Sequence, residues 1–174
     1  MIEISNTLMD RAIVDDDALM ELSEALRPSR VERLGGKIVV SPGTGGETGR
    51  RNSRLTRLLD EYAETHGFES FDSSTGFHVS DGDAPSADHA LLKTERWNAL
   101  TPEDRRKLPP LAPDVVVELR SENDRGREAI AEKCERWVAY GVGYVVLLDP
   151  FTKTIREWGV QAPGFPDLTA VFNL

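Results

Sequence analysis

The hydrophobic pattern of the N-terminal part predicts two helices with a strand pair between them. Residues 15–27 begin with three acids and continue with leucines at helical spacing, which predicts an amphipathic helix that ends at Pro28. A second helix is predicted from about Gly46 to His66. Between them, "VERLGGKIVVSP" predicts two short strands joined by a Gly-Gly turn. The apolar stripes are Leu19, Leu22 and Leu26 in the first helix, and Leu55, Leu58, Leu59 and Tyr62 in the second.

Strand patterns also occupy the middle of the chain. Residues 68–83 and 86–93 predict further strands of a sheet, with a turn-forming Asp-Gly pair between them. Residues 94–113 are polar and predict short helical pieces, one of which Thr101 is placed to cap. Residues 114–120, "DVVVELR", predict a central strand because they contain a run of three valines and a further leucine.

The last third of the chain predicts a strand, helix and strand in succession. The helix is expected over residues 124–141, with an apolar stripe of Ile130, Cys134, Trp137, Val138 and Gly141. A buried strand, "VGYVVLLDP", and an edge strand, "TIREWGV", follow it. Two strands joined by one helix are parallel with a right-handed crossover, whereas a hairpin is antiparallel. We therefore expect a single domain over residues 1–174, of the α/β (α+β) class, with a mixed sheet flanked by helices.

Composition excludes several other classes of protein. The 174 residues include no apolar run near the ~20 that a membrane span requires, and the N-terminus carries acids where a secretory signal has basic residues. A cytoplasmic location is therefore expected. One cysteine, Cys134, allows neither an internal disulfide nor a cysteine zinc site. The net charge of −9 argues against a broad basic surface for nucleic acid, although a local basic groove remains compatible with it.

Two charged residues, Glu118 and Arg120, stand inside the apolar run of the predicted central strand. A buried charge is costly unless it is paired or binds a metal, so the two form either a structural ion pair or a chemical site. Both point to the same face because side chains alternate along a strand. Asp114 also shares that face, but four strand residues span about 13 Å, too far for two carboxylates to hold one ion. A partner acid must come from another strand, and Asp88 is the candidate.

The basic residues of the two long predicted helices allow two interpretations each. Lys133 lies on the flank of the stripe that packs on the sheet, so its ammonium either approaches Glu118 or is solvated. The second helix carries four arginines largely on one side, which either contact a DNA backbone or pair with Glu61 and Glu64 in solvent. These arginines are Arg50, Arg51, Arg54 and Arg57.

Two long stretches, "SADHALLKTERWNALTPEDRRKLPPLAPDVVVELRSEND" and "KCERWVAYGVGYVVLLDP", resemble the Uma-type family of putative restriction endonucleases. The resemblance extends from "VERLGGKIVVSPG" to "LLDPFTKTIREW" and is strongest over residues 86–150. This family belongs to the PD-(D/E)XK nuclease superfamily. The resemblance implies a restriction-endonuclease-like fold and metal-assisted hydrolysis of DNA phosphodiester bonds. Since cutting both strands usually calls for two sites, a homodimer is also expected.

Carried over to this chain, the resemblance makes Asp88 and Glu118 the two acids of the divided motif and Lys133 the lysine of the following helix. Mg²⁺ or Mn²⁺ would be held by the two acids and the backbone carbonyl of Leu119. Glu32 matches an acid that precedes the Gly turn and would position Lys133 or support a second ion.

The chain departs from the superfamily pattern at two positions. Ala87 replaces the proline of the first half-motif, and Arg120 occupies the usual lysine position. A guanidinium stays protonated and cannot act as a general base, so Arg120 would instead clamp a phosphate oxygen or neutralise the acids. The alternative function is a catalytically weak or inactive nuclease-fold protein with a binding or regulatory role.

Overall fold

The computed structural model describes residues 2–3, 15–122, 124 and 126–173, and places eight strands in two sheets within these ranges. The strands are β1 (Ile2–Glu3), β2 (Arg30–Leu34), β3 (Lys37–Ser41), β4 (Phe68–Asp72), β5 (His89–Lys93), β6 (Val115–Leu119), β7 (Tyr144–Asp149) and β8 (Thr154–Gly159). The α-helices are α1 (Asp16–Ala25), α2 (Gly46–His66), α3 (Thr94–Ala99), α4 (Pro102–Arg106) and α5 (Arg127–Ala139). Two 3₁₀ turns, η1 (Ser80–Gly82) and η2 (Leu168–Val171), complete the described elements.

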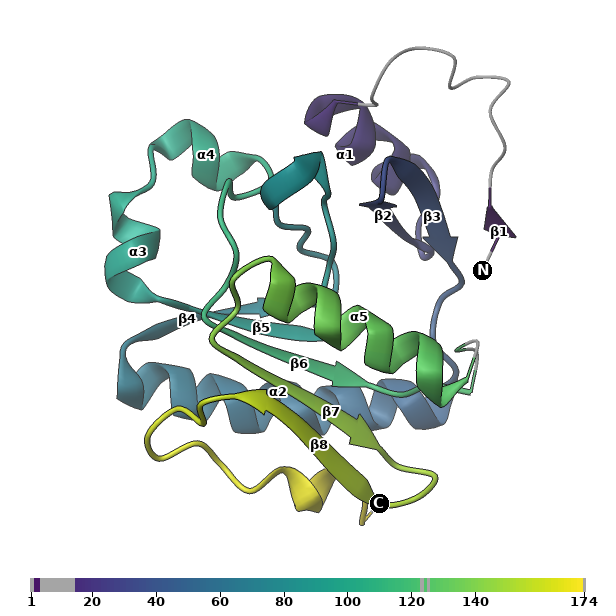
Figure 1. Cartoon of the computed structure of the whole chain (residues 1–174), viewed down its shortest axis with the longest axis vertical. Coiled ribbons are helices and arrows are strands. Elements are labelled where there is room, and N and C mark those ends of the chain that lie inside the picture. The colour runs from purple at the N-terminus through teal and green to yellow at the C-terminus, as the bar shows by residue number, and fades with distance from the viewer. Residues whose placement is uncertain (1, 4–14, 123, 125, 174) are drawn as a thin grey trace.

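The larger sheet has five strands in the order β4-β5-β6-β7-β8, with β6 at its centre (Figure 1). Strands β6 and β7 are parallel and are connected through α5, whereas the other neighbouring pairs are antiparallel. The mixed sheet, its central strand and the parallel pair predicted from the sequence are thus confirmed.

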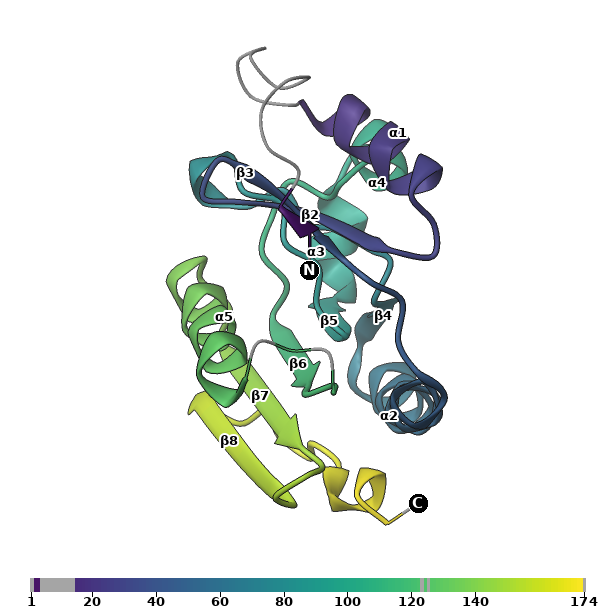
Figure 2. The ribbon, with the colours of Figure 1, turned by 90° about the vertical axis from the view of Figure 1, so that its right-hand side faces the viewer.

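The two faces of the central strand are covered by different helices (Figure 2). Val115, Val117 and Leu119 pack in the same apolar cluster as Leu55 and Leu59 of α2. Val116 packs on the opposite face, in a cluster that contains residues of α5. Because side chains alternate along a strand, Glu118 shares the α5 face with Val116. The sheet thereby directs this one acid of β6 toward α5.

The smaller sheet, in the order β1-β3-β2, contains the predicted hairpin. Both turn glycines, Gly35 and Gly36, have positive φ values, which a type I′ hairpin turn requires. Arg33 of β2 is buried and forms a 2.7 Å ion pair with Asp16 of α1, and it also donates to the carbonyl of Gly82. These contacts join the hairpin to α1 and to the loop before β5.

Helix α5 differs in three respects from the sequence expectation, one of which is that it ends at Ala139 and leaves Gly141 of the expected stripe beyond the helix. It begins at Arg127, because Gly126 has φ 109° and interrupts the helical backbone. Val138, which was expected in the apolar stripe, is 40% exposed. At 100° per residue this position lies about 80° from Ile130, at the border of the buried face. Residues 123 and 125, within or just before the predicted helix, lie outside the described residues.

The prediction of strand structure over residues 68–83 is only partly correct. Pairing with β5 ends at Asp72, whose carboxylate accepts hydrogen bonds from the backbone and hydroxyl of Ser74 and so closes a turn. The rest of the segment is irregular, apart from η1 and an isolated bridge between Gly76 and Ser86. Within the described part of the chain, no helix has the length and apolar character needed to cross a membrane.

Candidate active site

Asp88 and Glu118 approach each other across neighbouring antiparallel strands. His89 of β5 is paired with Val117 of β6, so continuing that register by one residue places Asp88 opposite Glu118. Opposite residues of such a pair point to the same face. The Oδ2 atom of Asp88 also accepts a 2.7 Å hydrogen bond from the backbone N–H of Leu119, which fixes the carboxylate at the end of β6. Both acids are buried, with Glu118 only 1% exposed.

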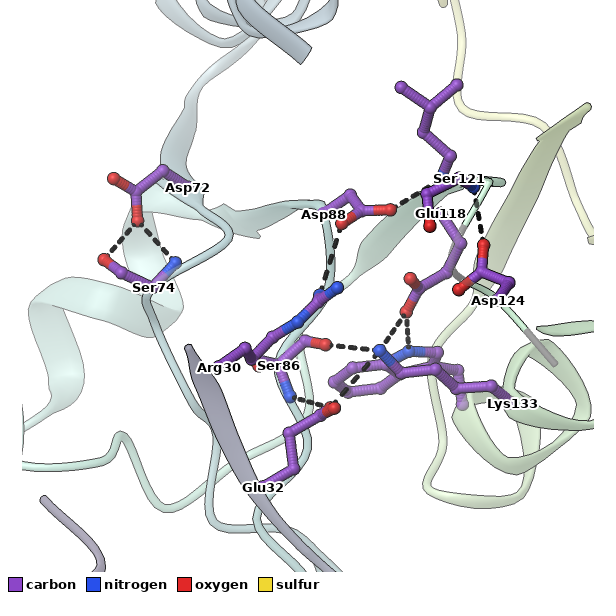
Figure 3. Close-up of polar contacts among 12 residues, drawn as sticks. Arg30, Glu32, Asp72, Ser74, Ser86, Asp88, Glu118, Ser121, Asp124 and Lys133 are labelled. Carbon is purple, nitrogen blue, oxygen red and sulfur yellow. Dashed lines mark hydrogen bonds and ion pairs between the residues drawn. The ribbon is translucent and has the colours of Figure 1, made fainter. Parts of the chain in front are cut away.

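Lys133 of α5 reaches this pair of acids from the helix side (Figure 3). Its Nζ lies 3.0 Å from Oε1 of Glu118 and donates a 2.7 Å hydrogen bond to the carbonyl of Ser86. Trp137, one helical turn later, donates its Nε1–H to the same Glu118 oxygen at 2.8 Å. The sequence left open whether Lys133 is solvated, and the structure places it against Glu118.

Glu32 of β2 contributes a third carboxylate to the cluster. Its Oε1 lies 3.2 Å from Nζ of Lys133 and accepts a 2.9 Å hydrogen bond from the backbone N–H of Ser86. Lys133 therefore lies between Glu32 of the small sheet and Glu118 of the large sheet (Figure 3). This contact is one of the two arrangements expected for Glu32, in which it positions the lysine.

Arg30, two residues before Glu32, completes the cluster. Its Nη1 donates to Oδ1 of Asp88 at 3.2 Å. Because side chains repeat every second residue on a strand face, Arg30 and Glu32 project together from β2 toward the acids. Two cations and three carboxylates thus share one buried cluster, defined by Arg30, Glu32, Asp88, Glu118 and Lys133.

The charges in this cluster shift one another's proton affinities. Burial raises the pKa of Glu118 to about 7, with a further contribution from Asp88, and Lys133 and Arg30 only partly offset this. Burial alone would also raise the pKa of Glu32, but Lys133 and Arg30 outweigh it and the value is lowered. For Lys133, burial opposes the charged form, yet Glu118 and Glu32 raise its pKa. The lysine is therefore held as an ammonium, whereas Glu118 takes up a proton near neutral pH.

A pocket of about 300 Å³ opens beside the cluster and is lined by Arg30, Glu32, Asp88, Glu118 and Lys133, together with residues of β3, α5 and the start of α2. Within the described ranges, no three His, Cys, Asp or Glu side chains form a group that could hold a metal ion. Mg²⁺ often uses only one or two protein carboxylates and completes its shell with water and substrate phosphate. Asp88 and Glu118 fit that smaller donor set, and Arg30 is the side chain that competes for Asp88.

Arg120 lies in a different group of charges. Its Nη1 contacts Oδ2 of Asp149 at 3.0 Å, and its guanidinium lies over the ring of Phe151, 5.0 Å from the centroid. Arg127 contacts the same oxygen of Asp149 at 3.2 Å. The structure therefore brings Asp88, Glu118, Lys133 and Glu32 together and places Arg120 with Asp149.

Asp114 and the arginines of α2 were also considered as candidates from the sequence. Asp114 accepts a hydrogen bond from the backbone N–H of Lys93 and pairs with Arg96 at 2.9 Å, at the opposite end of β6 from Leu119. These contacts place Asp114 outside the cluster, as expected from its distance to Glu118 along the strand. Of the arginines of α2, Arg51 pairs with Glu47 and Arg54 donates to the carbonyl of Ala170, contacts that were not expected.

Sequence reasoning missed Arg30, Ser86 and Trp137 as members of the site. The signal for Arg30 was its spacing of two from Glu32 on a predicted strand, and that for Trp137 its spacing of four from Lys133 on a predicted helix. Ser86 carried no comparable signal, because it contributes backbone atoms to the cluster.

Comparisons with known proteins identify the family of the chain and a shared fold. The model of the Uma2 family, described as putative restriction endonucleases, matches residues 17–162. A comparison with curated proteins finds no match. A similar solved structure is the crystal structure of a putative nuclease belonging to DUF820 from Anabaena variabilis ATCC 29413, which is 15% identical. The alignment covers 82% of this chain and 89% of that chain with a TM-score of 0.66, which shows a shared fold. The family match spans most of the sequence, and this chain belongs to the Uma2 family of putative restriction endonucleases.

Proposed function

We propose that the chain is a DNA endonuclease that hydrolyses phosphodiester bonds with the help of Mg²⁺ or Mn²⁺. One observation carries the proposal: two buried carboxylates of neighbouring strands, Asp88 and Glu118, line one pocket with Lys133 3.0 Å from Glu118. Carboxylate oxygens are the donors that these hard cations prefer. Family membership supports the same class of reaction.

Four side chains of the cluster have a proposed role in this reaction. Asp88 and Glu118 hold the ion, and the backbone carbonyl of Leu119 adds a third oxygen. When bound, the ion polarises the scissile phosphate and lowers the pKa of a coordinated water. Lys133 orients the attacking water through its ammonium hydrogens or stabilises the extra negative charge on the phosphate. Glu32 positions Lys133, because it contacts the ammonium at 3.2 Å from the side opposite Glu118.

Arg120 has no proposed role in this chemistry, because its guanidinium pairs with Asp149 and lies over the ring of Phe151. A homodimer is part of the proposal, since two copies supply one site for each DNA strand. Size-exclusion chromatography with light scattering measures this state independently of activity.

A second candidate function rests on Arg30. A guanidinium stays charged at any accessible pH and contacts Asp88 at 3.2 Å, so it competes with a cation for that carboxylate. The same fold would then bind nucleic acid or a protein without cutting.

Plasmid nicking in Mn²⁺ or Mg²⁺ separates the two functions. We expect wild type to nick the plasmid, Asp88→Asn and Glu118→Gln to lose this activity, and EDTA to abolish it. Asp114→Asn is the matched control, because it removes a carboxylate that pairs with Arg96 at the far end of β6. Equal nicking by wild type and both acid variants would show a contaminating nuclease and overturn the proposed site. A wild type that binds DNA without nicking it would favour the second function.

A further inference from the structure

A second cleft lies beside the candidate active site and has no role in the proposed chemistry. Its volume is about 560 Å³, within the range of about 300–1,000 Å³ that is usual for ligand pockets. It lies among α1, the loop after β4, and the segment that includes α3 and α4. Arg30 lines both this cleft and the active-site pocket, so the two hollows meet at the residue that contacts Asp88.

More of the charged side chains that line the cleft are positive than negative, although the protein as a whole carries a negative net charge. Among the described lining residues of the cleft, four are cationic and one, Glu24, is acidic. The whole chain carries a net charge of −9, whereas cations outnumber acids in the lining of this cleft. Three of the cations also contact carboxylates: Arg27 contacts Glu24, Arg30 contacts Asp88, and Lys107 contacts Asp17 and Glu103. The cations are Arg27, Arg30, Arg105 and Lys107. Such a cleft favours an anionic ligand next to the acids of the active site.

The hydroxyl of Ser86 is a buried hydrogen-bonding group at the cleft that has no partner among the described residues. Ser86 lines the cleft and is 3% exposed, and its Oγ has no hydrogen-bond partner among the residues that the structure describes. Its backbone N–H and carbonyl are already used by Glu32 and Lys133. A buried hydroxyl without a partner costs stability, and a ligand in the cleft would supply that partner.

Planar groups line the same cleft. The rings of Phe71 and Trp97 meet edge to face at 5.3 Å between centroids. The guanidinium of Arg105 lies over the Trp97 ring, 5.4 Å from its centroid. Nucleobases of unpaired strands stack on aromatic rings and on arginine planes, whereas paired bases are already stacked in the duplex.

We infer that this cleft binds one unpaired nucleotide of the DNA strand whose neighbouring phosphate enters the active site. The base packs against the Trp97 and Arg105 group and accepts or donates a hydrogen bond at Ser86, while Arg27 and Arg30 contact its phosphates. This inference rests on the proposed nuclease function and specifies its substrate: DNA with a single-stranded or extrahelical nucleotide at the cleavage position.

Fluorescence anisotropy in EDTA tests the inference without any cleavage. The probes are one labelled single strand, the same strand in a full duplex, and that duplex with one unpaired nucleotide. We expect wild type to bind the single strand and the interrupted duplex about tenfold more tightly than the full duplex, from base stacking. Ser86→Ala is expected to weaken this binding about two- to tenfold, the value of one hydrogen bond.

A matched pair of arginine variants tests whether the positive charge of the cleft contributes to DNA binding. Arg27→Gln, in the cleft, is expected to weaken binding and reduce the salt dependence by about one ion. Arg106→Gln removes the same charge from an exposed position of α4 outside the cleft lining and is expected to bind as wild type does. A thermal melt checks folding: Ser86→Ala is expected to melt at the wild-type temperature or above, because it removes an unpaired buried hydroxyl.

Two results overturn the inference: equal affinity of wild type for all three DNA forms, or unchanged binding of the unpaired strand by Ser86→Ala and Arg27→Gln. These experiments distinguish failure of the cleft inference from failure of the nuclease proposal. If Asp88→Asn abolishes nicking while the cleft variants bind normally, only the cleft inference fails. If wild type never nicks DNA but the cleft variants lose affinity for unpaired strands, only the nuclease proposal fails.

Discussion

Trp137 and Lys133 contact the same oxygen, Oε1 of Glu118, from successive turns of one helix, the first by a hydrogen bond and the second by an ion pair. The distances are 2.8 Å and 3.0 Å. Helix α5 thus supplies both an indole hydrogen bond and a positive charge to an acid that the central strand holds in the interior. This arrangement makes the stability of the protein depend on Lys133.

Replacing Lys133 by Met is expected to destabilise the metal-free protein by about 3–5 kcal/mol at neutral pH, because buried carboxylates lose their cation. The pKa of Glu32 is lowered in the folded protein, so its contribution is present at neutral pH and is lost as the pH falls through that lowered value. The deficit of the variant should therefore shrink in acid. Urea unfolding at several pH values measures it.

The matched control for this prediction is Lys93→Met, which removes an exposed ammonium at the end of β5. It is expected to change the free energy of unfolding by less than about 0.5 kcal/mol. Equal losses in the two variants would contradict a special role for Lys133 in the buried cluster.

The thermal stabilisation of wild type by Mn²⁺ is expected to increase as the pH rises from 6 to 8. Burial raises the pKa of Glu118 to about 7, so below that pH an arriving cation must displace a proton. The measurement is the difference in Tm between Mn²⁺ and EDTA at each pH. For Glu118→Gln, the Tm in Mn²⁺ should be little higher than the Tm in EDTA at either pH. A larger gain for wild type at pH 6 than at pH 8 would show that Glu118 does not ligate the ion.

Arg120→Ala is expected to cost about 1–3 kcal/mol at neutral pH, since Arg120 is a partly buried partner of the buried Asp149. Burial would raise the pKa of Asp149, but Thr152 and Arg120 outweigh it and lower the value. An acid with a lowered folded pKa stabilises the fold above its unfolded value and stops doing so as the pH falls through the folded one. The cost should therefore decline below about pH 3.8, the ordinary value for Asp.

Arg127→Ala gives the comparison for Arg120, because Arg127 contacts the same Asp149 oxygen with a side chain that is 50% exposed. An exposed pair contributes only about 0–1 kcal/mol. Chemical denaturation of both variants tests the difference, and a larger loss for Arg127→Ala would contradict the assigned contacts.

Cys134 is expected to resist thiol reagents in the native protein and to react when the protein unfolds. Its side chain is fully buried between α5 and the sheet, and burial raises the pKa of the thiol. Absorbance after addition of a disulfide reagent, with and without denaturant, measures this. Rapid reaction of the native protein would show that α5 does not stay packed on the sheet.

Periodicity was sufficient to predict most elements of this fold but not all of the site. The bounds of α2 and the parallel β6 and β7 pair were predicted because long apolar stripes and one connecting helix leave few alternatives. The irregular backbone after Asp72 was not predicted, because side-chain hydrogen bonds to Ser74 end the strand there. Glu118 was singled out as a charge in an apolar strand, with Asp88 and Lys133 as candidate partners, whereas the family resemblance supplied their roles and added Glu32. Their mutual contacts depend on packing between two sheets, which no local pattern records.

Arg30 and Glu32 belong to the small sheet, whereas Asp88 and Glu118 belong to the large sheet or its margin. Asp88 and Glu118 therefore have their complete set of charged neighbours only after the hairpin of β2 and β3 has packed against the large sheet. Until β2 docks, Asp88 would lack the guanidinium of Arg30, and Lys133 would lack the carboxylate of Glu32. A chain that loses the small sheet would therefore lose Arg30 and Glu32 from the cluster, even if the five-stranded sheet and α5 keep Asp88, Glu118 and Lys133.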